Sequence, residues 1–158
     1  MPMSCGLLIA AALLVTDPSV ADAHAGHAAA ATAPAAPPSV ATEPLFANIV
    51  SRSETLRAIV DGWMAAPAAP DAGEFAAFKA QTVELAARDM EGHVDLRERG
   101  VDGDLKCILK GIAEDMPLKV AAVEGAADDA ARQSALSELR YLLNDNVEVI
   151  TSPPTPAA

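Results

Sequence analysis

Aromatic side chains are scarce in this chain: Phe, Trp and Tyr make up only 3% of its residues, although 51% are hydrophobic. Much of the hydrophobic count is alanine, and runs rich in Val, Thr and Tyr with alternating polar positions, which are typical of strands, are missing. Ala, Leu, Glu and Arg are helix formers, so a core of Leu, Ile, Val and few Phe favours packing of helix on helix. The sequence therefore predicts an all-α protein.

Basic residues are also few, and none precedes Arg52. The formal net charge of the whole chain is −11 at pH 7. Such an acidic chain repels the phosphate backbone of nucleic acids. It also lacks the basic, apolar-backed helix face that holds a protein on an anionic membrane. We therefore expect neither nucleic acid nor a membrane surface as a partner.

The apolar run near the N-terminus covers only residues 6–15, whereas a transmembrane helix needs about 20 residues. The sequence Ala21-Asp22-Ala23 follows it and has the pattern of small residues that signal peptidase cleaves. The run predicts a signal peptide over residues 1–23, no stable membrane insertion, and export to the periplasm or out of the cell. The alternative is a hydrophobic N-terminal helix that is not removed.

Cysteine is nearly absent, since the chain has only Cys5 and Cys107. Removal of residues 1–23 would leave Cys107 alone, so that a disulfide within the mature chain would be impossible. In an oxidising compartment its thiol must then be buried, modified or paired between chains. We favour a small core residue, and a dimer linked through Cys107 is the alternative.

Two segments rich in alanine and proline flank the central part of the chain. Residues 24–42 and 151–158 contain mostly small residues and several prolines. Such segments bury too little apolar surface to offset the entropy that folding costs, so both are predicted to be disordered. Residues 43–150 are predicted to form the one folded domain.

Four segments within this domain have apolar residues at steps of three and four, the pattern of one helix face. Connections rich in proline or glycine separate them, which predicts a small antiparallel four-helix bundle. Asp71 and Glu74 have the spacing of a helix-starting capping box, and Gly100 is placed to end that helix in a left-handed conformation. The third helix is expected to be kinked or broken near Pro117. The predicted segments run from Pro44 to Ala66, from Asp71 to Gly100, from Asp104 to Val123, and from Asp128 to Ile150.

His24 and His27 are the candidate metal ligands of the predicted mature N-terminus. If processing frees the His24 amine, that amine and its own imidazole can chelate a metal, and His27 adds a second imidazole. Nitrogen-rich sites of this kind suit copper, with nickel and zinc behind it. The alternative is a tail whose two histidines have no function.

His93 is the only histidine of the predicted bundle, and Asp89 lies one turn before it on the same helix face. The pair could share a metal ion, or Asp89 could orient the ring. A haem held by His93 and a methionine (Met64, Met90 or Met116) is a further alternative for a four-helix bundle. A histidine that is solvated or paired with a carboxylate is the simpler expectation.

No catalytic pattern is present in the sequence. It has no Gly-rich phosphate loop, nucleophile elbow, zinc-protease helix or Cys-x-x-Cys-His haem attachment site. The sequence therefore favours a non-enzymatic, exported helical bundle that binds an unknown protein or small molecule. Copper handling through His24 and His27 and haem binding through His93 remain alternatives.

Overall fold

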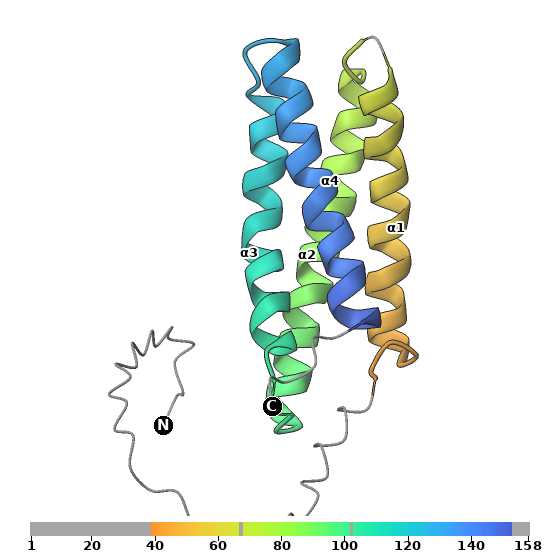
Figure 1. Cartoon of the computed structure of the whole chain (residues 1–158), viewed down its shortest axis with the longest axis vertical. Helices are drawn as coiled ribbons and strands as arrows, with labels where there is room; N and C mark the ends of the chain where they lie inside the picture. Colours follow the sequence, from red (N-terminus) through yellow and green to blue (C-terminus); the bar gives the residue numbers. More distant parts are fainter. Residues whose placement is uncertain (1–38, 67, 102, 153–158) are drawn as a thin grey trace, which may run out of the picture. The chain divides into compact units, whose positions relative to one another are not determined.

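The computed structural model describes residues 39–66, 68–101 and 103–152, and in this part of the chain it is helical and contains no strand (Figure 1). The structure confirms the predicted all-α class and the predicted number of helices. The helices are α1 (Pro44–Ala65), α2 (Ala72–Glu98), α3 (Leu105–Glu124) and α4 (Asp129–Thr151).

The four helices form an up-and-down bundle in which neighbours in sequence are neighbours in space (Figure 1). α2 packs against α1 and α3, and α4 packs against α3 and α1. This leaves two diagonal pairs across the core, α1 with α3 and α2 with α4. The short connections allow this arrangement because each only has to reverse the chain at one end of the bundle.

Asp71 and Gly100, from which the two ends of α2 were predicted, do lie at those ends and stabilise them. The Asp71 carboxylate accepts hydrogen bonds from the amides of Gly73 and Glu74, at 2.7 and 2.8 Å. At the other end Gly100 has a φ of 65°, and the amide after it donates to the Leu96 carbonyl at 3.1 Å. This is the six-residue hydrogen bond of a left-handed helix terminus, for which glycine is suited because it has no Cβ.

α3 runs through Pro117 as one helix. The predicted alternative of a break near Pro117 is therefore not observed. Pro117 lies on the exposed side of the helix. Met116 and Val120, on the face of α3 that points into the bundle, are buried in the core. Their packing continues across the proline, which offsets the backbone hydrogen bond that proline cannot make.

The core follows steps of three and four residues along each helix, the heptad pattern of coiled coils. In α2 the pattern includes small and polar residues among apolar ones, which the apolar stripe alone does not identify. Val83 is apolar and yet 67% exposed, whereas Thr82 beside it is buried because it continues the heptad steps. The buried residues are Phe46, Ile49, Ser53, Leu56 and Val60 in α1, Phe78, Thr82, Leu85, Asp89, Gly92 and Leu96 in α2, and Leu136, Leu139, Leu143, Asn146 and Ile150 among those of α4.

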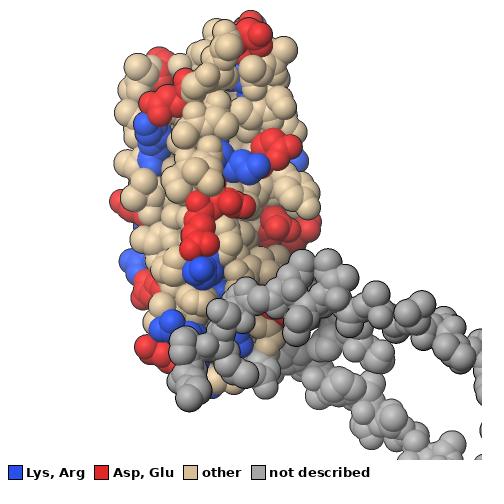
Figure 2. Space-filling view, turned by 90° about the vertical axis from the view of Figure 1, so that its left-hand side faces the viewer, with Lys and Arg blue, Asp and Glu red and all other residues tan. Residues whose placement is uncertain are grey.

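Acidic and basic side chains are interspersed on the outside of the bundle, as one face shows in Figure 2. An ion pair joins each pair of neighbouring helices around the bundle. Exposed pairs of this kind each contribute less than about 1 kcal/mol, so they help to align the helices more than they stabilise them. These ion pairs are Arg52–Glu84 at 2.8 Å, Lys79–Glu124 at 2.7 Å, Lys119–Glu138 at 3.1 Å and Arg140–Asp61 at 2.5 Å.

No helix in the described part of the chain is both long and apolar enough to cross a bilayer.

Candidate functional site

Three fully buried polar side chains meet in the core: Ser53 of α1, Asp89 of α2 and Asn146 of α4. The Asn146 amide nitrogen donates to both carboxylate oxygens of Asp89 at 3.0 Å and to the Ser53 hydroxyl oxygen at 3.1 Å. Ser53 in turn donates to the Ile49 carbonyl at 2.9 Å. The bond between Asp89 and Asn146 joins the diagonal pair α2 and α4. We call these three side chains the polar layer.

The polar layer contains a carboxyl group without a counter-charge. No ion pair in the described part of the chain includes Asp89, and its hydrogen-bond donor, Asn146, is neutral. Burial raises the pKa of Asp89 to about 7, and the hydrogen bond from Asn146 lowers it in part. The amide oxygen of Asn146 is itself buried and accepts no hydrogen bond in the described structure. The layer therefore lacks one hydrogen-bond donor.

His93 ties the end of α2 to the start of α3. Its Nδ1 lies 2.6 Å from the Lys106 carbonyl oxygen, and the ring is half-buried. Since a carbonyl can only accept, Nδ1 carries a proton and donates it in this hydrogen bond. Among the described residues no hydrogen bond joins His93 to Asp89, which bonds to Asn146 instead. The structure thus gives the two predicted partners separate contacts.

The predicted metal and haem ligands are not gathered at one place in the described structure. Within residues 39–66, 68–101 and 103–152, no three His, Cys, Asp or Glu side chains are grouped so as to hold a metal ion. Met116 lies ten residues along α3 from the Lys106 carbonyl that His93 contacts, about 15 Å at the rise of a helix. Met64 lies near the end of α1, where α2 begins, and thus far from His93 along the bundle, while Met90 precedes His93 on the same helix. His24 and His27 lie outside the described residues, so copper binding stays a prediction.

Cys107 is half-buried in the first turn of α3. It does not carry a free thiol in this structure. Cys5, the other cysteine of the sequence, lies outside the described residues. A dimer linked through Cys107 stays a prediction.

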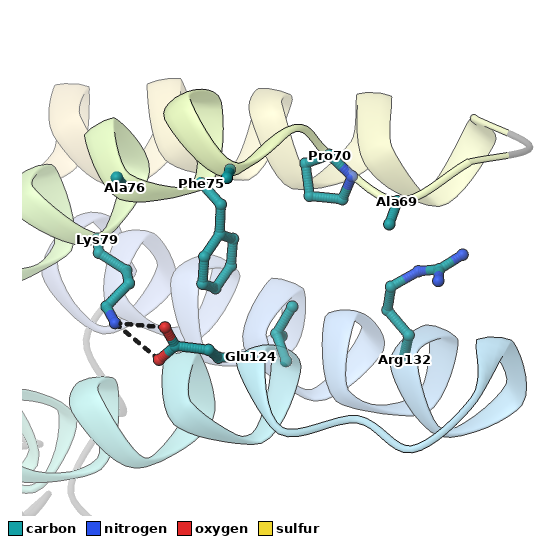
Figure 3. A pocket seen from close by; sticks show the side chains of 9 residues that line it. Ala69, Pro70, Phe75, Ala76, Lys79, Glu124 and Arg132 are labelled. Carbon is teal, nitrogen blue, oxygen red and sulfur yellow. Dashed lines mark hydrogen bonds and ion pairs between the residues drawn. The ribbon is translucent and has the colours of Figure 1, made fainter.

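A groove opens at the end of the bundle where α2 begins, α3 ends and α4 begins. Its volume is about 480 Å³, and its apolar lining is formed by Phe75, Val123, a proline and three alanines. Figure 3 shows the Phe75 ring reaching from α2 into this space. The ion pair between Lys79 and Glu124 borders one side, and Arg132 rises from α4 on the other. The lining residues are Ala69, Pro70, Ala72, Phe75, Ala76, Lys79, Val123, Glu124 and Arg132.

An aromatic cluster supports the floor of the groove from within the bundle. The Trp63 ring lies 5.9 Å from the Phe75 ring and 4.7 Å from the Phe78 ring, centre to centre. Phe78 is buried, whereas Trp63 and Phe75 are half-buried. Such tilted and edge-on contacts hold aromatic rings in fixed positions. The Phe75 face that lines the groove is therefore preorganised.

Comparison of the chain with family models, with curated proteins and with solved structures gave no match. The groove is open to solvent and can take a molecule. The polar layer is closed and can take a proton.

Asp89 is a candidate residue that the sequence pairs with His93, and in the structure its carboxylate accepts hydrogen bonds from Asn146. Ser53 and Asn146 were not identified, because the inner face of each helix was defined by its apolar residues alone. The heptad spacing could have found them: Ser53 lies four residues after Ile49 and three before Leu56, and Asn146 lies three after Leu143. The groove has no comparable pattern, since its residues come from segments far apart in the sequence.

Proposed function

We propose that this chain is an exported, non-enzymatic binding protein that holds a small amphipathic molecule in the groove at the Phe75 end of the bundle. The observation that carries the proposal is the groove itself. Its volume of about 480 Å³ falls in the range of about 300–1,000 Å³ that is usual for small-molecule sites. Its apolar lining with a few polar groups is also usual for such sites.

The lining favours a ligand with an apolar body and an anionic group. The apolar body would pack on the Phe75 ring and Val123. Two basic side chains, Lys79 and Arg132, face one acidic side chain, Glu124, so the lining is positive in a chain whose net charge is −11. Arg132 is paired with Asp129; the Arg132 side chain is 16% exposed and that of Asp129 is 83% exposed, so the Asp129 carboxylate can move into solvent and leave the guanidinium to a ligand anion.

The proposal is tested with 8-anilinonaphthalene-1-sulfonate, a probe that has an aromatic body and a sulfonate. Trp63 is the only tryptophan of the chain and lies against Phe75, so its fluorescence reports on a probe bound there. We expect saturable binding of the probe, with quenching of Trp63 by energy transfer to it. Absence of saturable binding to the folded protein would contradict the proposal.

Two matched variants locate the site. Ala76→Phe adds a ring inside the groove, whereas Ala77→Phe adds the same ring at an exposed position of α2 outside it. We expect Ala76→Phe to weaken binding by about tenfold or more, since the filled volume excludes the probe, and Ala77→Phe to bind as the wild type does. If both variants bind the probe equally well, it binds elsewhere and the groove is not the site.

A further inference from the structure

We propose that the polar layer of Ser53, Asp89 and Asn146 is a proton switch: uptake of one proton by Asp89 tightens the packing of α2 against α4 across the core, and loss of that proton loosens it. This inference is independent of the groove. It rests on a carboxyl group that is fully buried, on the neutral partners that surround it, and on a buried amide oxygen that lacks a donor.

Among the described residues, the neighbouring helices offer Asp89 no positive charge that could stabilise its ionised form. From α4 the Asn146 amide nitrogen donates to it, and from α1 the Ser53 hydroxyl contacts that same nitrogen. On α2 itself, His93 one turn away bonds to the Lys106 carbonyl instead. The basic side chains at this level of the helices have partners outside the core. These are Arg52–Glu84, Arg88–Glu91, Lys110–Glu114 and Arg57 with Asn144.

The Asn146 amide oxygen, which has no hydrogen-bond donor, can accept a hydrogen bond from a protonated Asp89. With Asp89 ionised, the Asn146 amide nitrogen donates to the carboxylate, and the amide oxygen has no donor. Rotation of the amide by half a turn exchanges its oxygen and nitrogen at nearly the same positions. A protonated Asp89 then donates its hydroxyl hydrogen, which comes from solvent, to that oxygen. The layer thus has one hydrogen-bonded arrangement for each protonation state.

The direction of the pH effect follows from the two pKa values of Asp89. In the folded protein burial raises its pKa to about 7, and in the unfolded chain it takes the ordinary value of about 3.9. Between these values the folded state binds more protons than the unfolded state. The stability that Asp89 contributes is therefore fully present below about pH 4 and is lost as the pH rises through 7. Ionisation of Asp89 multiplies the equilibrium constant for unfolding by a factor that grows on the order of a hundredfold between about pH 5 and about pH 8.

A layer with a purely structural role would behave differently. Buried polar residues at heptad positions can fix the register of packed helices at some cost in stability. Such a role needs the hydrogen bonds of the layer but no change in protonation. Dependence on pH therefore separates the two roles.

The test is urea denaturation of the full chain at about pH 5 and about pH 8, for the wild type, Asp89→Asn and Asp115→Asn. Asp89→Asn keeps the shape of the side chain and cannot ionise. Asp115→Asn removes an exposed carboxylate of α3 and serves as the matched control. We expect the ratio of unfolding constants, wild type over Asp89→Asn, to rise on the order of a hundredfold from the lower to the higher pH. The ratio for Asp115→Asn should change by less than about threefold. A ratio for Asp89→Asn as flat as that of the control overturns the proposal.

Asn146→Ala is a second variant, which decides the matter if Asp89→Asn does not fold. The hydrogen bond from Asn146 lowers the pKa of Asp89, so its removal should move the loss of stability to higher pH. The pH at which stability falls is compared directly between this variant and the wild type. A midpoint above that of the wild type supports the switch, and an unchanged midpoint overturns it.

Discussion

Gly92 of α2 offers a sharp test of how tightly the core is packed. It is buried, and a Cβ atom at this position would lie 3.2 Å from a methyl of Leu109, 3.2 Å from the Phe46 ring and 3.5 Å from a methyl of Ile49. These three side chains are themselves fully buried, so they have little room to move. Gly92→Ala gains about 1 kcal/mol from helix propensity, but overpacking a core costs about 1–3 kcal/mol. We expect a net loss of about 1 kcal/mol in the free energy of unfolding.

Gly111→Ala is the matched control. Gly111 lies away from the ends of α3 and is exposed to solvent, and a Cβ atom there would meet nothing within 4 Å. The same substitution should therefore raise the free energy of unfolding by about 1 kcal/mol. Both values come from urea denaturation followed by circular dichroism at 222 nm, the wavelength of helix. If Gly92→Ala stabilises the protein as much as Gly111→Ala does, the contact of α2 with α1 and α3 is looser than described, and the reasoning is refuted.

Two further predictions concern a helix end and the apolar core. Asp71→Ala removes the two hydrogen bonds that cap α2 and should lower the free energy of unfolding by about 1 kcal/mol in urea denaturation; no change would mean that the cap does not form in solution. Leu143→Ala removes a fully buried side chain of α4 and should lower it by about 2–5 kcal/mol, seen as a lower melting temperature; an effect under about 1 kcal/mol would place Leu143 outside the core.

Much of the fold was predictable because its determinants are local. Apolar steps of three and four residues located the four helices, and Asp71 and Gly100 marked the two ends of α2. The position of Val83 was not predictable from hydrophobicity alone. The heptad pattern assigns the core position to Thr82 instead. Its hydroxyl donates a hydrogen bond to the Lys79 carbonyl of the same helix at 2.8 Å, so it can be buried.

The candidate sites were less predictable because they depend on contacts between helices. The residues around Asp89 in the sequence do not distinguish it from a surface aspartate. Its burial depends on packing against α4, where it contacts Asn146, a residue far along the chain. His93 likewise finds its partner, the Lys106 carbonyl, on the next helix. Pairing of Asp89 with His93 was expected from their spacing, but spacing on one helix does not say which neighbouring helix each side chain faces.

The groove and the polar layer are tested separately, since they lie on different residues and different measurements report on them. Probe binding that fails in the wild type removes the proposed function and leaves the proton switch standing. If Asp89→Asn leaves the pH dependence of stability unchanged, the proton switch is removed and the proposed function of the groove is not affected. Asp89→Asn should itself leave probe affinity unchanged at about pH 5, where both proteins have a neutral layer.

The most direct test of the polar layer is the titration of Asp89 itself. Carbon-13 NMR of the wild-type protein follows the chemical shift of each aspartate side-chain carboxyl as the pH is changed, with Asp89→Asn used to assign its resonance. Burial without a counter-charge predicts a single titration step for Asp89 with a pKa of about 7. A step near the ordinary aspartate value of about 4 would contradict a buried, uncompensated carboxyl in the core of this bundle.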